Sequence, residues 1–103
     1  MKITEKLQLL SDSTRLRMLR LLSREELSVA ELQEILEMGQ SRISSHLSLL
    51  RRNRMVVDRR DGKKTFYALS LDKSPNYDIV RLALAEDSNE DFWESDQSGL
   101  TRI

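Results

Sequence analysis

Apolar residues in the first half of the chain recur every three or four positions, which is the spacing of one face of an α-helix. Two such segments come first, at residues 4–10 and 13–22, and Asp12 occupies the N-cap position of the second. Their apolar stripes consist of Leu7, Leu10, Leu16, Leu19 and Leu22. The pattern therefore predicts two amphipathic helices that each bury one face.

A third helix is predicted to begin at Ser28. Ser28 and Glu31 have the spacing of a capping box, in which each side chain accepts a hydrogen bond from the other residue's backbone N–H. Leu27 and Leu32 are spaced for the hydrophobic staple that often accompanies this box. We expect the helix to run to about Glu37.

The fourth predicted helix follows Gly39, which can serve as its N-cap. One side of this helix is an apolar stripe of Ile43, Leu47 and Leu50. The opposite side is short, rich in hydroxyl groups and basic, which suits a helix that approaches the edges of DNA bases. The residues that we expect to contact DNA from this helix are Gln40, Ser41, Arg42, Ser44, Ser45 and His46. His46, the single histidine, is expected either to pack at the edge of the domain or to donate to a phosphate.

A β-hairpin is predicted after this helix, which Asn53 is expected to end in the left-handed conformation. Two strand-like runs, residues 55–60 and 64–69, flank Asp61-Gly62, a dipeptide typical of a two-residue type I′ turn. This turn would pair Val57 with Phe66. The cations that we expect on DNA phosphates are Arg59, Arg60, Lys63 and Lys64 at the tip. The whole pattern predicts a mainly α fold with a small β-hairpin, a winged helix-turn-helix.

The C-terminal part of the chain divides into an apolar and an acidic segment. Residues 77–85 have the pattern of a helix with more apolar side chains than a solvent-facing terminal helix would carry, which indicates a partner. The residues that we expect at a homodimer interface are Leu7, Leu10, Ile79, Leu82 and Ala83. Residues 1–86 are thus read as one DNA-binding and dimerisation domain, and residues 87–103 as an acidic tail or the start of a linker.

Two roles are open for this acidic segment. It could be a mobile polyanion that competes with DNA for the basic surface, or it could maintain solubility while Phe92-Trp93 docks on the domain.

Charge sharpens the prediction of a nucleic-acid surface. The formal net charge of the 103 residues is zero, but residues 42–64 carry eight Lys or Arg against two Asp, a local net charge of +6. Such a concentration of positive charge is typical of a surface that binds nucleic acid. A polar helix face alone is more often just solvated, so the basic hairpin beside it carries the argument.

The composition of the chain argues against several other classes of protein and of site. With no cysteine in the chain, disulfides, cysteine-ligated zinc and thiol redox sensing are excluded. We find no combination of nucleophile, base and orienting group and no glycine loop for phosphate, so we expect neither an enzyme nor a cofactor. No apolar run exceeds four residues, which predicts no membrane span or signal peptide and a cytoplasmic location.

Three stretches, DSTRLRMLRLL at residues 12–22, ELSVAEL at 26–32 and QSRISSHLSLLR at 40–51, resemble the ArsR/SmtB family of bacterial winged-helix repressors. The resemblance covers roughly residues 5–71. It implies a homodimer joined by the first and last helices, which binds a two-fold operator in double-stranded DNA and releases it when an effector binds.

The sequence departs from the family pattern at several positions. Ser28 and Ala30 stand where metal-sensing members carry cysteines, and no histidine follows Asp78, so we expect no metal site. Ser13 replaces a frequent proline, and Arg54 replaces a frequent glycine before the first strand of the hairpin. The effector and the operator are not indicated by the sequence.

Two alternatives to a free-standing repressor stay open at this stage. The chain could be the DNA-binding part of a longer regulator with a methyltransferase domain, since similar domains occur in such fusions. It could also be a winged helix that binds protein instead of DNA.

Overall fold

The computed structural model describes residues 2–70, 76–86 and 93–102. Its elements, in order, are α1 (Ile3–Leu10), α2 (Ser13–Arg24), β1 (Leu27–Ser28), α3 (Val29–Leu36), α4 (Gln40–Arg52), β2 (Val56–Asp61), β3 (Lys64–Leu69), α5 (Tyr77–Glu86) and α6 (Trp93–Arg102). The strands form one antiparallel sheet in the order β1-β3-β2. The predicted winged helix-turn-helix fold is confirmed, with β1 as a strand that the sequence did not predict.

The predicted helix starts are confirmed by their capping hydrogen bonds. Ser28 Oγ accepts from the Glu31 amide at 3.2 Å, and Glu31 Oε1 accepts from the Ser28 amide at 2.9 Å. Asp12 Oδ1 accepts from the Arg15 amide at 3.0 Å at the start of α2. Gly39 is the N-cap of α4, as expected, and offers no side chain to it.

The end of α4 differs from the prediction by one residue. Asn53 has φ −96°, outside the left-handed region, and Arg54 has φ 61°, inside it. The Arg54 amide donates to the Arg51 carbonyl at 3.0 Å and the Met55 amide to the Leu50 carbonyl at 2.9 Å. These two bonds are those of a Schellman motif with Arg54 at its left-handed position. Asn53 instead donates its side-chain amide to the Leu49 carbonyl at 2.8 Å.

The hairpin also differs in register. Val57 pairs with Ala68 and not with Phe66, and Asp61 pairs with Lys64, so the two loop residues are Gly62 and Lys63. Gly62 has φ +64°. A positive φ at the first loop residue alone is the pattern of a type II′ turn, for which glycine is preferred, and not of the predicted type I′ turn. The partner shift of two residues leaves every side chain on its expected face of the sheet.

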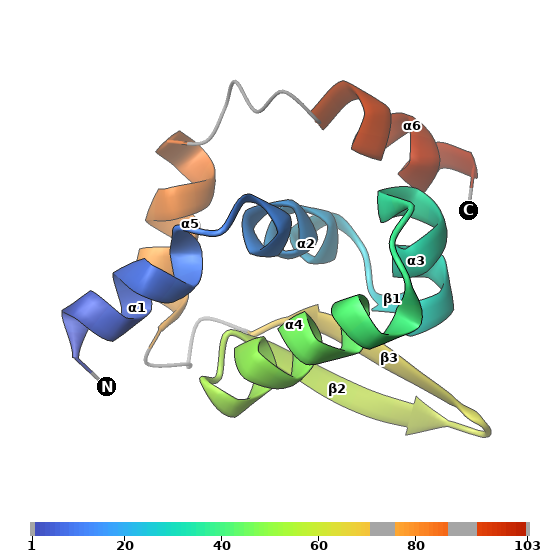
Figure 1. Ribbon diagram of the computed structural model, residues 1–103, viewed down its shortest axis with the longest axis horizontal. Helices are drawn as coiled ribbons and strands as arrows, with labels where there is room; N and C mark the ends of the chain where they lie inside the picture. The colour runs from blue at the N-terminus through green and yellow to red at the C-terminus, as the bar shows by residue number, and fades with distance from the viewer. Residues whose placement is uncertain (1, 71–75, 87–92, 103) are drawn as a thin grey trace.

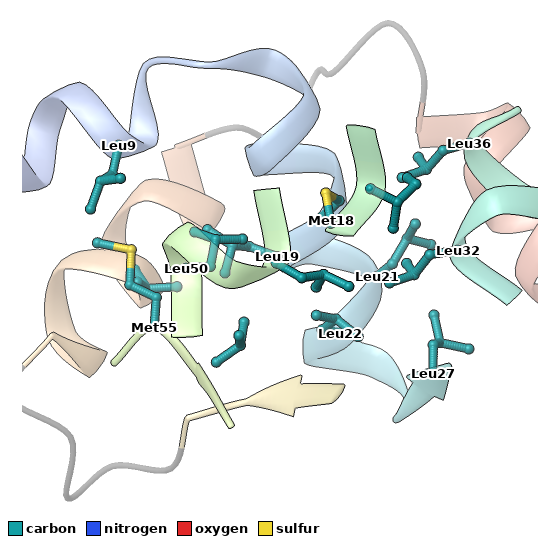
Figure 2. Packing of buried hydrophobic residues seen from close by; sticks show 14 of the residues in the cluster. Leu9, Met18, Leu19, Leu21, Leu22, Leu27, Leu32, Leu36, Leu50 and Met55 are labelled. Carbon is teal, nitrogen blue, oxygen red and sulfur yellow. The ribbon is translucent and has the colours of Figure 1, made fainter. Parts of the chain in front are cut away.

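The helices pack around α2, which lies in the middle of the molecule (Figure 1). Figure 2 shows buried side chains that meet there. The most deeply buried hydrophobic ones are Met18, Leu19, Leu21, Leu27, Leu32, Ile43, Leu47, Leu50, Met55, Val56 and Val80. Burying an aliphatic side chain of this size stabilises the folded state by roughly 1.5–3 kcal/mol. The apolar stripe predicted for the fourth helix is therefore what holds α4 in place.

The prediction of a tail or linker is wrong for residues 93–102. These residues form α6, which packs on α2 and α3 (Figure 1). Asp96 is 1% exposed and receives two hydrogen bonds from Arg17, at 2.8 and 3.0 Å. Gly99 lies against Ile35, and Trp93 packs against the core. The docking expected of Trp93 is thus observed, whereas Phe92 and most of the acidic residues before it lie outside the described residues.

Not one of the helices in the described parts of the chain has both the length and the apolar character needed to cross a membrane.

Candidate nucleic-acid interface

The polar face of α4 is turned outward because the opposite face is locked into the core. Ile43, Leu47 and Leu50 are fully buried. Of the residues predicted to contact DNA from this helix, Gln40, Ser41, Arg42 and Ser45 are exposed, and Ser44 and His46 are half-buried. These six residues therefore lie outside the buried stripe of α4, four of them exposed and two partly covered.

The hairpin of β2 and β3 lies beside α4 and extends past it (Figure 1). All four predicted wing cations are exposed: Arg59, Arg60, Lys63 and Lys64. The last three form no ion pair with any residue that the structure describes. Helix face and wing thus offer two neighbouring positions at which an anionic backbone could be held.

Arg59 differs from the other wing cations because it is paired within the protein. Its guanidinium donates to both carboxylate oxygens of Glu26, at 2.7 and 2.8 Å, and lies 5.0 Å from the centre of the Phe66 ring. Asp61 is a second, more distant partner at 3.8 Å. The hydrogen bonds from Arg59 lower the pKa of Glu26, and the same pair raises the pKa of Arg59. Part of the charge of Arg59 is therefore already neutralised, and we expect it to contribute less to DNA binding than its three neighbours.

Sequence reasoning missed this pair because Glu26 and Arg59 are 33 positions apart. They meet only because β1 lies next to β3, and Phe66 of β3 is opposite both Ser28 and Arg59. The acidic residue just before β1 was visible in the sequence, but nothing in its spacing indicated the third strand.

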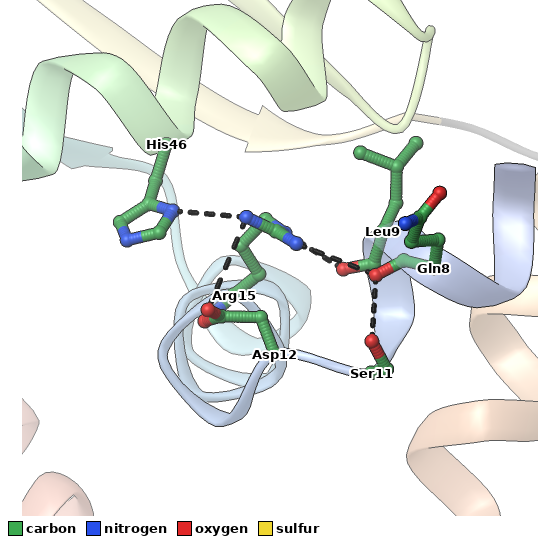
Figure 3. Close-up of polar contacts among 6 residues, drawn as sticks. All are labelled: Gln8, Leu9, Ser11, Asp12, Arg15 and His46. Carbon is green, nitrogen blue, oxygen red and sulfur yellow. Dashed lines mark hydrogen bonds and ion pairs between the residues drawn. The ribbon is translucent and has the colours of Figure 1, made fainter.

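His46 contacts a second helix through Arg15, another pair that the sequence did not indicate. One terminal guanidinium nitrogen of Arg15 lies 3.4 Å from Nδ1 of His46 (Figure 3). Arg15 also donates to the Leu9 carbonyl at 2.7 Å and to the Gln8 carbonyl at 3.4 Å, and Asp12 lies 4.0 Å away. Of the two positions expected for His46, the structure supports the edge of the domain, with the ring packed toward α2.

The charges in this cluster shift two pKa values. Burial of the ring, together with the positive charges of Arg15 and Arg42, lowers the pKa of His46 in spite of the attraction of Asp12. Burial of the carboxyl acts to raise the pKa of Asp12, but the amide and the charge of Arg15 outweigh it and lower this pKa. At neutral pH the imidazole is therefore neutral and the carboxyl ionised.

The residues predicted for a dimer interface are not all on the surface. Leu7 and Leu82 are exposed, with 54% and 56% of their area accessible, and Ile79 and Ala83 are half-buried. Leu10, by contrast, is 6% exposed because it points into the core of its own chain. α1 and α5 lie next to each other (Figure 1), and the exposed Ile3, which the sequence analysis did not single out, extends the stripe by one helical turn from Leu7.

The expectation that the protein has no metal site depends on which metal-ligating side chains the chain supplies. Within the described ranges, His, Asp and Glu nowhere form a group of three or more that could hold a metal ion. Ser28, at a position where metal-sensing relatives are expected to carry cysteine, uses its hydroxyl to cap α3.

Comparison with known proteins places this arrangement in a family. Residues 12–57 match the family described as "Bacterial regulatory protein, arsR family". The chain is 39% identical over 95 residues to the arsenic resistance transcriptional regulator ArsR1 of Pseudomonas putida, a match that covers 91% of this chain and 73% of that protein.

Comparison with solved structures finds similar proteins. The chain is similar to reduced HlyU from Vibrio cholerae, with TM-score 0.67 and 34% identity over 80% of this chain and 84% of that one. It is also similar to a homodimeric winged helix-turn-helix DNA-binding domain from Mycobacterium bovis, with TM-score 0.64 and 25% identity over 81% of this chain and 77% of that one.

Proposed function

Because this chain belongs to the ArsR family of bacterial regulatory proteins, we propose that it is a transcriptional repressor that binds a two-fold symmetric operator as a homodimer. The observation that carries the proposal is the polar face of α4, fixed outward by its buried stripe and flanked by three wing cations without a partner among the described residues. A helix of this kind reads bases in the major groove, while a basic hairpin holds the phosphate backbone.

The two parts of the interface are assigned different tasks. Arg42 is exposed in the first turn of α4, where helix-turn-helix proteins contact base edges, and its guanidinium can donate two hydrogen bonds to guanine. Lys63 and Lys64 sit at the tip of the wing and present point charges suited to phosphates. Base contacts carry sequence information and phosphate contacts do not.

We therefore expect Arg42→Ala and the double change Lys63→Ala with Lys64→Ala to behave differently. The Arg42 variant should lose roughly 1–3 kcal/mol of binding free energy and relax the preference for certain bases. The wing variant should weaken binding to all sequences alike and reduce the salt slope by about two units per half-site. Fluorescence anisotropy with the DNA upstream of the gene and with random DNA, at several salt concentrations, measures both effects.

Arg102→Ala is the matched control, because Arg102 is an exposed arginine on α6, a helix that packs on α2 and α3 and not on the wing. This variant should bind DNA as the unchanged protein does. Equal effects of the Arg42 and wing changes on specific and random DNA would contradict the assignment of tasks, and no loss in either would contradict DNA binding by this face.

A further part of the proposal is that arsenite, cadmium and zinc do not release the protein from its operator. Soft ions prefer thiolates, and the 103 residues contain no cysteine and one histidine. A site shared by two protomers could therefore offer at most two imidazoles together with carboxylates. Titration of each ion into the protein–DNA complex should leave the affinity unchanged, with a chelator-treated sample as the control. A loss of about tenfold at low micromolar free ion, as expected of a matched site, would contradict this part of the proposal.

A further inference from the structure

Arg15 connects three helices at one point. It extends from the first turn of α2, donates to the carbonyls of Gln8 and Leu9 in the last turn of α1, and reaches Nδ1 of His46 on α4 (Figure 3). The carboxylate of Asp12 holds it from a fourth side at 4.0 Å. A cation is stabilised at the negative C-terminal end of a helix, so α1 and Asp12 fix the guanidinium without help from His46.

This fixed donor determines where the proton of the imidazole resides. Arginine carries only donors, so the contact at 3.4 Å requires Nδ1 to be an acceptor. A neutral imidazole that accepts at Nδ1 carries its proton on Nε2. The ring faces Arg15 of α2 and Asp12, the N-cap of that helix, and lies one helical turn from Arg42. The lowered pKa of His46 keeps the ring neutral at neutral pH.

The Nε2–H that results is turned away from Arg15 (Figure 3). His46 itself lies one helical turn after the exposed Arg42, on the same face of α4. Nitrogen donors on this side can bond to phosphate oxygens, whereas an Nε2 lone pair would face them unfavourably. The tautomer of His46 therefore decides whether the ring helps or opposes DNA binding.

We propose that Arg15 is a positioning residue for DNA binding: its guanidinium holds His46 in the tautomer protonated on Nε2, so that α4 presents a ready N–H donor to the DNA backbone. The proposal rests on the DNA-binding function proposed above. In this proposal Arg15 itself does not contact DNA. The contact between α2 and α4 orients the proton of His46 in addition to packing the two helices.

The first test needs no DNA. His46 is the single histidine of the chain, so ¹⁵N-labelled protein gives one pair of ring nitrogen signals. At neutral pH the unchanged protein should show a protonated Nε2 and an unprotonated Nδ1. Arg15→Ala should move the two nitrogen shifts toward each other as the tautomers mix, and Arg15→Lys, which retains a cationic N–H donor, should restore part of the difference. A proton on Nδ1 in the unchanged protein, or no change of spectrum in Arg15→Ala, would overturn the proposal.

The second test asks whether the tautomer matters for binding. Arg15→Ala should weaken operator binding about three- to tenfold for each half-site, which is the effect of losing roughly one hydrogen bond there. His46→Gln keeps an N–H donor near the position of Nε2 without needing Arg15 to orient a proton, so it should lose less operator affinity than His46→Ala, which keeps no donor. In the His46→Gln background, Arg15→Ala should then have little further effect.

A purely structural role of Arg15 predicts the opposite, an equal loss in both backgrounds, and that result would overturn the proposal. Thermal unfolding of each variant shows whether it is folded, and Arg15→Met, which keeps an unbranched side chain but no N–H donor, replaces Arg15→Ala if the latter is not. If Arg42→Ala weakens binding while Arg15→Ala does not, only the positioning role fails. If neither change matters, the proposed DNA-binding face itself fails.

Discussion

Arg54 is a residue whose backbone and side chain have conflicting preferences. It occupies the left-handed position of the Schellman motif that ends α4, with φ 61°. A Cβ in this region costs roughly 1–2 kcal/mol, which is why glycine is the usual choice there. The family resemblance pointed to a glycine at this place, and the structure supplies the physical reason.

Arg54→Gly should therefore be more stable than Arg54→Ala. Both changes remove the same arginine side chain, and they differ only in the Cβ that strains the left-handed backbone. The difference in unfolding free energy should be about 1 kcal/mol in favour of glycine, reduced somewhat by the greater entropy of glycine in the unfolded chain. Urea denaturation with equal m-values measures it. An alanine variant as stable as the glycine variant would show that the turn relaxes to a negative φ.

At the residue scale, sequence reasoning worked where a signal is local. Ser28 with Glu31, and Asp12 with α2, could be predicted because a cap depends only on residues three positions apart. The choice between Asn53 and Arg54 could not, because it depends on where Met55 must enter the core to begin the sheet. The Arg15–His46 contact, across 31 positions, needed the packing of α2 against α4.

At the scale of elements, α6 is the helix that the acidic composition of its segment made hard to predict. Trp93, Asp96 and Leu100 lie on one face at helical spacing, but a carboxylate in the middle of that face hides its amphipathic pattern. The buried acid is accommodated only because Arg17 of α2 reaches it, 79 positions away. A local reading of the sequence therefore sees an acidic tail where the folded chain has a docked helix.

Asp96→Asn should release α6 from α2. The change removes the carboxylate charge that faces the mostly buried guanidinium of Arg17, and breaking a buried ion pair in this way costs about 3–5 kcal/mol unless the helix undocks. The cost is limited to the docking free energy of α6, so we expect local opening instead of global unfolding. Trp93, the single tryptophan, should shift its emission to longer wavelength as it leaves Arg20 and Arg24, whose guanidinium carbons lie 5.2 and 5.3 Å from its ring.

Glu94→Gln makes the same chemical change at an exposed neighbour and should leave the emission unchanged. An Asp96→Asn variant with unshifted Trp93 emission and undiminished stability would mean that packing, and not the ion pair, holds α6.

At the scale of the whole molecule, the exposed apolar stripe on α1 and α5 needs a partner. Ile3, Leu7 and Leu82 are each more than half exposed, on two helices that lie together. If a second copy covers them, the recognition helices of the dimer can lie about 34–36 Å apart, one turn of DNA. Leu10 is not part of this surface, so the exposed apolar stripe on α1 is narrower than the sequence indicated.

Leu82→Asp should convert the dimer to a monomer, because a carboxylate cannot be buried in an apolar interface without a partner. Sedimentation equilibrium at micromolar concentration measures the mass. Val57→Asp is the control: Val57 is another exposed aliphatic residue, at 51%, but it lies on the outer face of the wing. A dimer that survives Leu82→Asp would contradict this interface, as would a monomer formed by the unchanged protein.

The fold, the recognition helix and the wing charges could be predicted because they follow from local periodicity, turn residues and charge clustering. The third strand, the docking of α6 and the Arg59–Glu26 pair depend on contacts between distant segments, which one sequence does not encode locally. Leu7 and Leu10 show, within one apolar stripe, the limit of prediction from local sequence. Both fit the helical pattern, but only the packing of the other helices determines that Leu10 faces inward.

Ser28 is shared by two structures: it pairs with Phe66 in the sheet and caps α3, the helix that precedes α4. Because β1 passes directly into α3, no residue separates the sheet from the helix that precedes α4. If the wing and α4 both contact DNA as proposed, their fixed spacing makes binding depend on the local shape of the double helix as well as on its sequence. In the proposed homodimer, the angle between the two protomers is one coordinate that a regulatory signal could adjust.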